Sequence, residues 1–184
     1  MNEVGPRSNG PLIEARGLNK NFGPIPALAG VDLELAGGQV IGLLGENGCG
    51  KTTLLKVLAG VMQDHAGHVR IAGRRLGPET KACVSFLPDA NYLKDSATVS
   101  QCIGMFSDFF SDFRADKASD MIKFFGLAED MKLKQMSKGM REKAQIALAM
   151  SRDAKVFLLD EPISGVDPAA RDVILKGIVR NLEA

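Results

Sequence analysis

The stretch that decides the fold is Gly45-Glu46-Asn47-Gly48-Cys49-Gly50-Lys51-Thr52. It follows the apolar run 40–44 and leads through Thr53 into the apolar-rich segment 54–58, so the pattern predicts a buried strand, a glycine loop and a helix in succession. Glycines in the loop let backbone N–H groups converge on phosphate oxygens, and the start of a helix adds its positive dipole end. Lys51 would reach the terminal phosphates, and the Thr52 hydroxyl would bind a Mg²⁺ ion. The stretch therefore predicts a nucleotide site, the alternative being an ordinary glycine-rich turn with an exposed lysine.

The bulk composition narrows the class of protein. The chain has 184 residues, of which 45% are hydrophobic, which suits one domain with a buried core. Its net charge of +1 gives no reason to expect nucleic acid as a partner. Cys49, Cys83 and Cys102 show no disulfide or zinc spacing, and His65 and His68 form no metal motif. No apolar run approaches the roughly 18 residues of a membrane span and no signal peptide is recognisable, so we expect a cytoplasmic protein.

The first half of the chain carries strand patterns. Residues 1–11 are rich in Gly, Pro, Asn and Ser and predict a loose N-terminal arm. Segments 12–16 and 31–35 predict strands of an antiparallel β layer that leads into the nucleotide core, and 67–73 predicts a further strand. A more continuous apolar segment, 82–87, predicts a buried strand. We therefore expect the β layer and the nucleotide-binding core to occupy 12–90.

Helix patterns replace strand patterns over 91–137, which we expect to be a helical subdomain. Thr98 and Gln101 form a capping-box pattern that opens one helix. A second helix is predicted over 116–125, where the apolar face consists of Ala118, Met121, Ile122 and Phe125. Six of the nine phenylalanines lie in this subdomain: Phe106, Phe109, Phe110, Phe113, Phe124 and Phe125. They build either the subdomain's own core or, in part, an exposed docking patch for a partner.

The remaining residues, 138–184, are expected to return to the core. Ser137 is a candidate N-cap of a helix that runs to Met150, and a buried strand is predicted over 155–159. Asp167 and Pro168 form the pattern of an N-cap followed by a first-turn proline, which opens the last helix.

The strand over 155–159 ends in the acidic pair Asp160-Glu161. A parallel sheet places such an Asp beside the phosphates, where it orders Mg²⁺, and the following Glu can act as general base for a water that attacks the γ-phosphate. The alternative is a solvated charge pair that ends a strand.

From about Leu12 to the end, the chain resembles the ATP-binding subunits of ABC transporters. Five blocks stand in the order typical of that family: Phe22, the glycine loop 45–52, the segment Met136-Ser137-Lys138-Gly139-Met140, the strand ending in Asp160-Glu161-Pro162, and Ser164-Gly165-Val166-Asp167. The resemblance implies an α/β fold with a P-loop NTPase core, a mostly parallel sheet flanked by helices, together with the antiparallel β layer and the helical subdomain. The whole of 1–184 would form a single ABC ATPase domain.

The resemblance also implies the cofactors and partners. Mg-ATP would be hydrolysed with Glu161 and Lys51 as the catalytic residues and with Mg²⁺ held by Thr52, Asp160 and Asp89. Two copies, or one copy and a related subunit, would sandwich two ATP molecules head to tail. The chain looks most like subunits of exporters whose multi-span membrane part is a separate polypeptide that docks on the helical subdomain, which would place it on the inner face of the membrane.

Further binding residues come from the same resemblance. The nucleotide would be contacted by the glycine-loop residues Gly45, Glu46, Asn47, Gly48, Cys49, Gly50, Lys51, Thr52 and Thr53. Phe22 would stack on adenine, although taken alone a phenylalanine is more often a core residue. Ser137 and Gly139 would contact the γ-phosphate held by the other copy, although Ser137 alone is equally an ordinary N-cap. Asp167 would add a contact across the dimer.

Three departures from the family pattern stand out. The usual signature L-S-G-G-Q has Lys138 in place of its first glycine and Met140 in place of its glutamine. Asp89 stands where the family has a glutamine that ligates Mg²⁺. The family's switch histidine lies beyond the last residue of this chain, so we expect that the closing strands and helix of the cassette are missing. The uncovered apolar surface would then lower stability or promote self-association.

Two other function classes remain open at this point. One is a soluble ABC-type ATPase that remodels a ribosome, a chromosome or a repair complex, and the other is an ATP-dependent scaffold that binds nucleotide without rapid hydrolysis. Cys49, in the glycine loop, is either a reactive thiol protected by Mg-ATP or a tolerated small residue.

Overall fold

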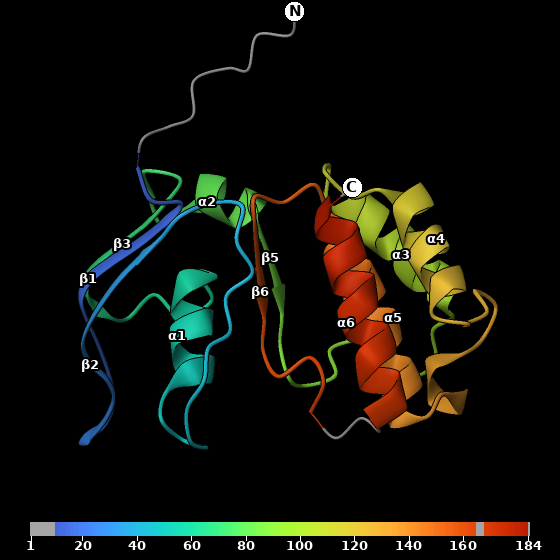
Figure 1. Cartoon of the computed structure of the whole chain (residues 1–184), viewed down its shortest axis with the longest axis horizontal. Coiled ribbons are helices and arrows are strands. Elements are labelled where there is room, and N and C mark those ends of the chain that lie inside the picture. The colour runs from blue at the N-terminus through green and yellow to red at the C-terminus, as the bar shows by residue number, and fades with distance from the viewer. Residues whose placement is uncertain (1–9, 165–167, 184) are drawn as a thin grey trace, which may run out of the picture. The chain divides into compact units, whose positions relative to one another are not determined.

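The computed structural model describes residues 10–164 and 168–183 and divides the chain into two compact units. The first unit ends at Lys81 and the second begins at Ala82. Antiparallel strands and a helix of eight residues dominate the first unit, and longer helices dominate the second (Figure 1).

The first unit is built on a four-stranded antiparallel sheet in the order β2-β1-β3-β4. Its strands are β1 (Ile13–Phe22), β2 (Ile25–Leu35), β3 (Ala66–Ile71) and β4 (Arg74–Arg75). Side chains alternate between the two faces of the sheet. On β3, Val69 and Ile71 are buried, whereas His68 and Arg70 are exposed. The predicted antiparallel β layer is confirmed, and it contacts helix α1 (Lys51–Leu58) through β2.

Strand β1 runs six residues beyond the predicted segment 12–16. Gly17 has a φ of +55°, and the register with β2 shifts between Ala15 and Leu18. A glycine in the left-handed region is the usual first residue of a bulge, which lets a strand continue after an extra residue. The Gly17 N–H donates to Asp32 Oδ1 at 2.6 Å, which satisfies a donor near the bulge. Gly17, which directly follows the predicted strand, therefore marks a bulge within the longer strand β1.

The predicted buried strand over 40–44 is wrong in this structure. The segment has no regular secondary structure and belongs to neither sheet of the described residues. Val40 is 72% exposed and Leu44 is 92% exposed. A strand exists only with hydrogen-bonded neighbours, and the apolar pattern reports the tendency to be buried without supplying those neighbours. The glycine loop is therefore preceded by an irregular segment rather than by a paired strand.

The second unit contains a two-stranded parallel sheet, β5 (Val84–Leu87) with β6 (Val156–Leu159). The strands pair from Val84 with Val156 to Leu87 with Leu159, so both carboxyl ends lie at the same edge. Both predicted strands are confirmed with shorter bounds, because Ala82 ends the short helix α2 (Pro78–Ala82). Parallel pairing of these buried strands is the sheet type expected for the nucleotide core.

Helices α3 (Val99–Phe109), α4 (Ala115–Phe124), α5 (Lys138–Met150) and α6 (Pro168–Glu183) surround a single apolar cluster, and a 3-10 turn η1 (Leu133–Gln135) precedes α5 (Figure 1). The capping box of Thr98 and Gln101 opens α3 as predicted. The predicted face of α4 is buried at all four positions. Ser137 caps α5, accepting the Met140 N–H at 3.3 Å. Pro168 is the first residue of α6, while Asp167, its predicted N-cap, lies outside the described residues.

The six phenylalanines divide between the two interpretations. Phe106 and Phe125 are buried in the helical cluster, and Phe110 and Phe113 pack against it. The Phe106 ring lies 5.5 Å from each of the rings of Phe110 and Phe113, a spacing typical of favourable aromatic pairs. In contrast, Phe109 is 77% exposed and Phe124 is 39% exposed. Four of the six therefore form the core of the subdomain, and Phe109 and Phe124 lie on its surface.

Candidate nucleotide-binding site

The glycine loop lies in the first unit, immediately before α1. Gly48 has a φ of +82° and Gly50 a φ of +97°, both in the left-handed region that glycine adopts without strain. Gly50 is also the N-cap of α1, and the Leu54 N–H donates to its carbonyl at 2.9 Å. The loop therefore turns the chain sharply into a helix, and the N-terminus of a helix is where an anion binds most favourably.

Gly50 has a second reason to be glycine. A Cβ atom at this position would lie 2.3 Å from the Ala27 carbonyl oxygen on β2 and 3.2 Å from a Leu28 side-chain carbon. Real Cβ atoms do not approach a backbone carbonyl so closely, so any other residue would displace the loop from the sheet. In contrast, a Cβ at Gly48 would meet nothing within 4 Å, and only its φ favours glycine.

Lys51 folds back over the loop. Its Nζ donates to the carbonyl oxygens of Gly45 and Glu46, each at 2.8 Å, and lies 3.9 Å from Cys49 Sγ. An ammonium has three donors and no fixed direction, so it can exchange carbonyl partners for phosphate oxygens without moving far. The side chain is thus held where a phosphate in the loop would meet it.

The start of α1 has the electrostatic character of an anion site. Thr52 and Thr53 are half-buried in its first turn, and that turn has no acidic residue. A helix of this kind presents about half a positive charge at its N-terminus, which stabilises a phosphate. Glu46 and Asn47 are exposed in the loop, away from the first turn. The glycines of the loop, the Lys51 side chain and the start of α1 together form a site that suits a polyphosphate.

Phe22 ends β1 and is 47% exposed, so it is not the core residue that its type alone suggests. Lys20 Nζ lies 4.9 Å from the centroid of its ring and also forms an ion pair with Asp64 at 2.7 Å. This hydrogen bond to the lysine lowers the pKa of the Asp64 carboxyl. An exposed ring on a strand end can stack on a planar base.

The acidic pair lies in the second unit, at the carboxyl end of β6. Asp160 is 2% exposed, and its N–H donates to the Leu87 carbonyl at 2.9 Å, which extends the β5–β6 pairing by one step. Asp160 is therefore not the solvated strand-ending charge of the alternative interpretation. Glu161 is exposed and has a φ of +49°, a conformation that few residues other than glycine adopt. Such strain is concentrated at functional sites.

The other predicted residues of the second unit lie around the start of α5. Asp89 is exposed shortly after β5, and Gly139 is half-buried in the first turn of α5. Lys138 Nζ lies 3.7 Å from Glu142 Oε1 one turn along the helix, and most of the lysine side chain is exposed. Burial raises the pKa of the Glu142 carboxyl, Lys138 opposes that shift, and the charge of Asp89 adds to it. Gly165, Val166 and Asp167 lie outside the described residues.

Two contacts that the sequence did not predict join α5 to the segment after β5. Gln145 Nε2 donates to Asn91 Oδ1 at 2.7 Å, and Arg141 Nη1 forms an ion pair with Asp95 Oδ1 at 2.9 Å. The partners are 54 and 46 residues apart, so no local pattern could have revealed them. The Lys138–Glu142 pair, at i and i+4 of a helix, was accessible to pattern analysis. These contacts tie the helix that begins at Ser137 to the loop that carries Asp89.

Residues 10–164 and 168–183 contain no group of three or more His, Cys, Asp or Glu side chains arranged to hold a metal ion. Among the same residues, no helix is both long and apolar enough to cross a bilayer.

Comparison with known proteins settles the family. The family model described as "ABC transporter" matches residues 28–164, well over half of the chain. The chain belongs to this family. It is 31% identical over 182 residues to the Fe(3+) ions import ATP-binding protein FbpC of Mesorhizobium japonicum, an alignment that covers 94% of this chain and 51% of that protein. It is 29% identical to the Nod factor export ATP-binding protein I of Cupriavidus metallidurans, with coverage of 94% and 60%.

Solved structures of ABC proteins have the same fold. The ATP-binding subunit of an ABC transporter superposes with a TM-score of 0.82 at 26% identity, covering 94% of this chain and 75% of that one. A nucleotide-free ATP-binding cassette gives a TM-score of 0.78 at 21% identity, with coverage of 94% and 78%, which supports the fold alone. The predicted P-loop NTPase fold is confirmed. The chain spans about half the length of several of the curated relatives it matches, and these include both import and export proteins.

Proposed function

We propose that this chain binds Mg-ATP and hydrolyses it as the ATP-binding subunit of an ABC transporter. The observation that carries the proposal is the glycine loop: Gly50 lies so close to β2 that only glycine fits, and it opens α1 with Lys51 folded over the loop. A loop of this geometry offers backbone N–H donors and a helix N-terminus to a polyphosphate. Membership of the ABC family makes ATP the expected nucleotide.

The proposed roles follow the chemistry of each side chain. Lys51 moves from its two carbonyl partners to the β- and γ-phosphates, and the loop N–H groups of 45–53 bind the phosphate chain. Phe22 stacks on adenine. Mg²⁺ is held by the Thr52 hydroxyl with the carboxylates of Asp160 and Asp89, since hard oxygen donors suit this ion. Bound Mg²⁺ would neutralise charge that develops on the transferred phosphoryl group.

Glu161 is the proposed general base. Its exposed carboxylate follows the buried Asp160, so it can accept a proton from a water that attacks the γ-phosphate in line, while the leaving ADP keeps the bridging oxygen. Its strained backbone supports a functional rather than a stabilising role.

We further propose that hydrolysis requires a second copy or a related subunit. Ser137, Gly139 and Asp167 would complete the ATP site of the opposite subunit, with the start of α5 directed at the γ-phosphate. The positive end of the α5 dipole and the cation of Lys138 support this role electrostatically.

Export, rather than import, is the proposed direction, with a separate multi-span membrane subunit docked on the helical subdomain. The exposed apolar side chains of Tyr92, Met105 and Phe109 support such a contact, because a water-exposed aromatic group is costly unless it is covered. The similarity to a Nod factor export protein agrees with this direction, although import proteins are equally similar. The chain would then work at the inner face of the membrane.

Nucleotide titration of the full chain tests the proposal. We expect Mg-ATP to bind wild type and not Lys51→Ala or Gly50→Ala, whereas Lys56→Ala, which removes a lysine from the last turn of α1, binds normally. Single-turnover hydrolysis should be lost in Glu161→Gln with binding retained. A wild type that fails to bind Mg-ATP, or loop variants that bind as well as wild type, would refute the nucleotide site. If the chain bound Mg-ATP but did not hydrolyse it in the presence of its partner subunits, the result would favour the ATP-dependent scaffold over the ATPase.

Isolation of the native protein from gently solubilised membranes tests the transport role. A co-purifying multi-span membrane protein supports it, and recovery only with ribosomes or DNA contradicts it.

A further inference from the structure

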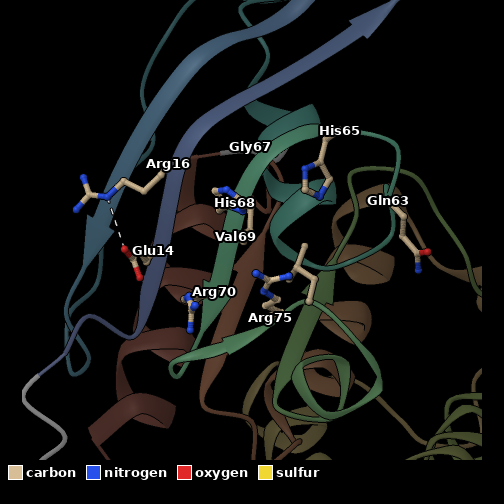
Figure 2. A pocket seen from close by; sticks show the side chains of 10 residues that line it. Glu14, Arg16, Gln63, His65, Gly67, His68, Val69, Arg70 and Arg75 are labelled. Carbon is tan, nitrogen blue, oxygen red and sulfur yellow. Dashed lines mark ion pairs between the residues drawn. The ribbon is translucent and has the colours of Figure 1, made fainter.

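The outer face of the antiparallel sheet places basic residues directly opposite one another. Arg70 on β3 pairs with Arg75 on β4 and, on its other side, with Glu14 on β1. Arg16 on β1 pairs with His68 on β3. Opposed residues of an antiparallel pair point to the same face with their Cβ atoms about 5 Å apart. Figure 2 shows these side chains around one stretch of β3.

The acidic groups near these strands are already engaged. Arg16 forms ion pairs with Glu14, at 3.6 Å, and with Glu34. Arg74, which neighbours Arg75 in the chain, forms an ion pair with Glu79. The nearby carboxylates therefore neutralise Arg16 and Arg74.

Arg70 and Arg75 lack such acidic partners. Arg70 Nη1 donates to the Gly73 carbonyl at 3.0 Å, and neither arginine forms a salt bridge within the residues that the structure describes. Like charges directly opposite each other on a sheet destabilise it. The carboxylate nearest to these two guanidinium groups, that of Glu14, forms its ion pair with Arg16, so a bound anion would offset the remaining repulsion.

The pair borders a pocket of about 530 Å³. Its lining consists of Glu14, Arg16, Gln63, His65, Gly67, His68, Val69, Arg70, Arg75 and Leu76. The volume lies within the roughly 300–1,000 Å³ of small-molecule sites. Three arginines against one glutamate, with two imidazoles and an amide, form a set of donors with net positive charge.

We propose that this pocket binds a small ligand that carries two or more negative charges on phosphate or carboxylate groups. Guanidinium groups bind both kinds of oxyanion in a bidentate manner, and two of them side by side select a ligand with more than one charge. None of the pocket residues belongs to the glycine loop, so the site is additional to the proposed nucleotide site. Such a site would let an anionic metabolite alter the stability of the sheet that carries Phe22.

Calorimetric titration with two probes tests the proposal. Pyrophosphate represents phosphate ligands and citrate represents carboxylate ligands, and both are titrated into the full chain carrying Lys51→Ala so that the glycine loop does not compete. We expect Arg70→Gln and Arg75→Gln each to weaken binding of the preferred probe by about tenfold or more, the loss expected for one charge-assisted hydrogen bond. Arg74→Gln is the matched control, because it removes the same charge from a residue already paired with Glu79.

The two probes separate the phosphate source from the carboxylate source. If Arg74→Gln weakened binding of the probe as much as Arg70→Gln and Arg75→Gln, the effect would be one of net charge and the proposal would be overturned. It would also be overturned if neither pyrophosphate nor citrate bound. Thermal unfolding gives an independent measurement: without a ligand, Arg75→Gln should melt at a higher temperature than wild type because the opposed charges are removed. The preferred probe should then stabilise wild type and the Arg74→Gln variant more than Arg75→Gln, whereas general salt stabilisation would raise all three equally.

Discussion

Arg152 and Asp112 form a two-bond ion pair, with Nε 3.0 Å from Oδ1 and Nη2 3.0 Å from Oδ2. The same guanidinium donates to the Val84 carbonyl at 2.9 Å and to the Ala82 carbonyl at 2.7 Å, and lies 4.2 Å from the centroid of the Phe110 ring. Arg152 is 5% exposed. The Arg152 side chain therefore connects the end of α5 to the start of β5 and to the loop between α3 and α4.

We expect Arg152→Met to destabilise the protein by about 3 kcal/mol, because it leaves Asp112 and two carbonyl groups without their donor. The measurement is the free energy of unfolding in urea. Arg114→Met is the matched control, since Arg114 forms an ion pair with Asp116 on the exposed surface, where such pairs contribute little. If both variants lost equally little stability, the buried pair would not have the central role that its contacts suggest.

The capping box of α3 gives a second stability test. Thr98 Oγ1 accepts the Gln101 N–H at 3.2 Å, and Gln101 Oε1 accepts the Thr98 N–H at 3.0 Å. Thr98→Ala should lower the free energy of unfolding by about 1 kcal/mol, because one of these helix-terminal donors loses its partner. Ser100→Ala, an exposed change two residues later, should leave stability nearly unchanged. A larger loss in Ser100→Ala than in Thr98→Ala would contradict this role of the cap.

Both caps were predictable because their signals are local. The Thr98 and Ser137 patterns each involve residues within one helical turn, and the structure confirms both. The buried face of α4 follows in the same way from a 3.6-residue period. The glycine loop was predictable too, since the spacing of Gly45, Gly50, Lys51 and Thr52 is itself a local pattern.

Features that depend on distant segments escaped the sequence. The segment 40–44 has the composition of a buried strand but no hydrogen-bonded neighbour among the described strands, so it is exposed. The Arg152–Asp112 pair spans 40 residues, and each member alone is typical of a surface. The positive φ of Glu161 could not be expected either, because glutamate rarely adopts it.

Cys49 and Cys102 should differ in reactivity. Cys49 is exposed in the glycine loop, whereas Cys102 is buried and burial raises the pKa of its thiol, so its reactive thiolate is scarce. We expect a maleimide to modify Cys49 far faster than Cys102 and to abolish ATP binding, with Mg-ATP protecting Cys49. Mass spectrometry of digested protein measures both rates, and Cys49→Ala should bind ATP and resist inactivation. Equal rates with and without Mg-ATP would place the nucleotide elsewhere.

Glu142 provides a test of pH dependence. Burial raises the pKa of its carboxyl, the charge of Asp89 acts in the same direction, and Lys138 opposes both. A carboxyl whose pKa is higher in the folded state binds its proton more tightly there, so its ionisation destabilises the fold. This cost is absent below the usual pKa of a glutamate, grows as the pH rises through the raised pKa, and is complete above it.

Glu142→Gln removes that cost while keeping the shape of the side chain. We therefore expect the variant to melt at a higher temperature than wild type at neutral pH, and this difference to shrink as the pH is lowered to about 4, near the usual glutamate pKa. Glu129→Gln is the control, since it removes a negative charge from the same unit outside this cluster. A difference for Glu142→Gln that is constant with pH would mean that folding leaves the pKa of this carboxyl unchanged. A variant less stable than wild type at neutral pH would mean that the ion pair with Lys138 outweighs burial. The start of α5 would then be held by charge attraction, and Lys138 would be less available to a phosphate than its exposure suggests.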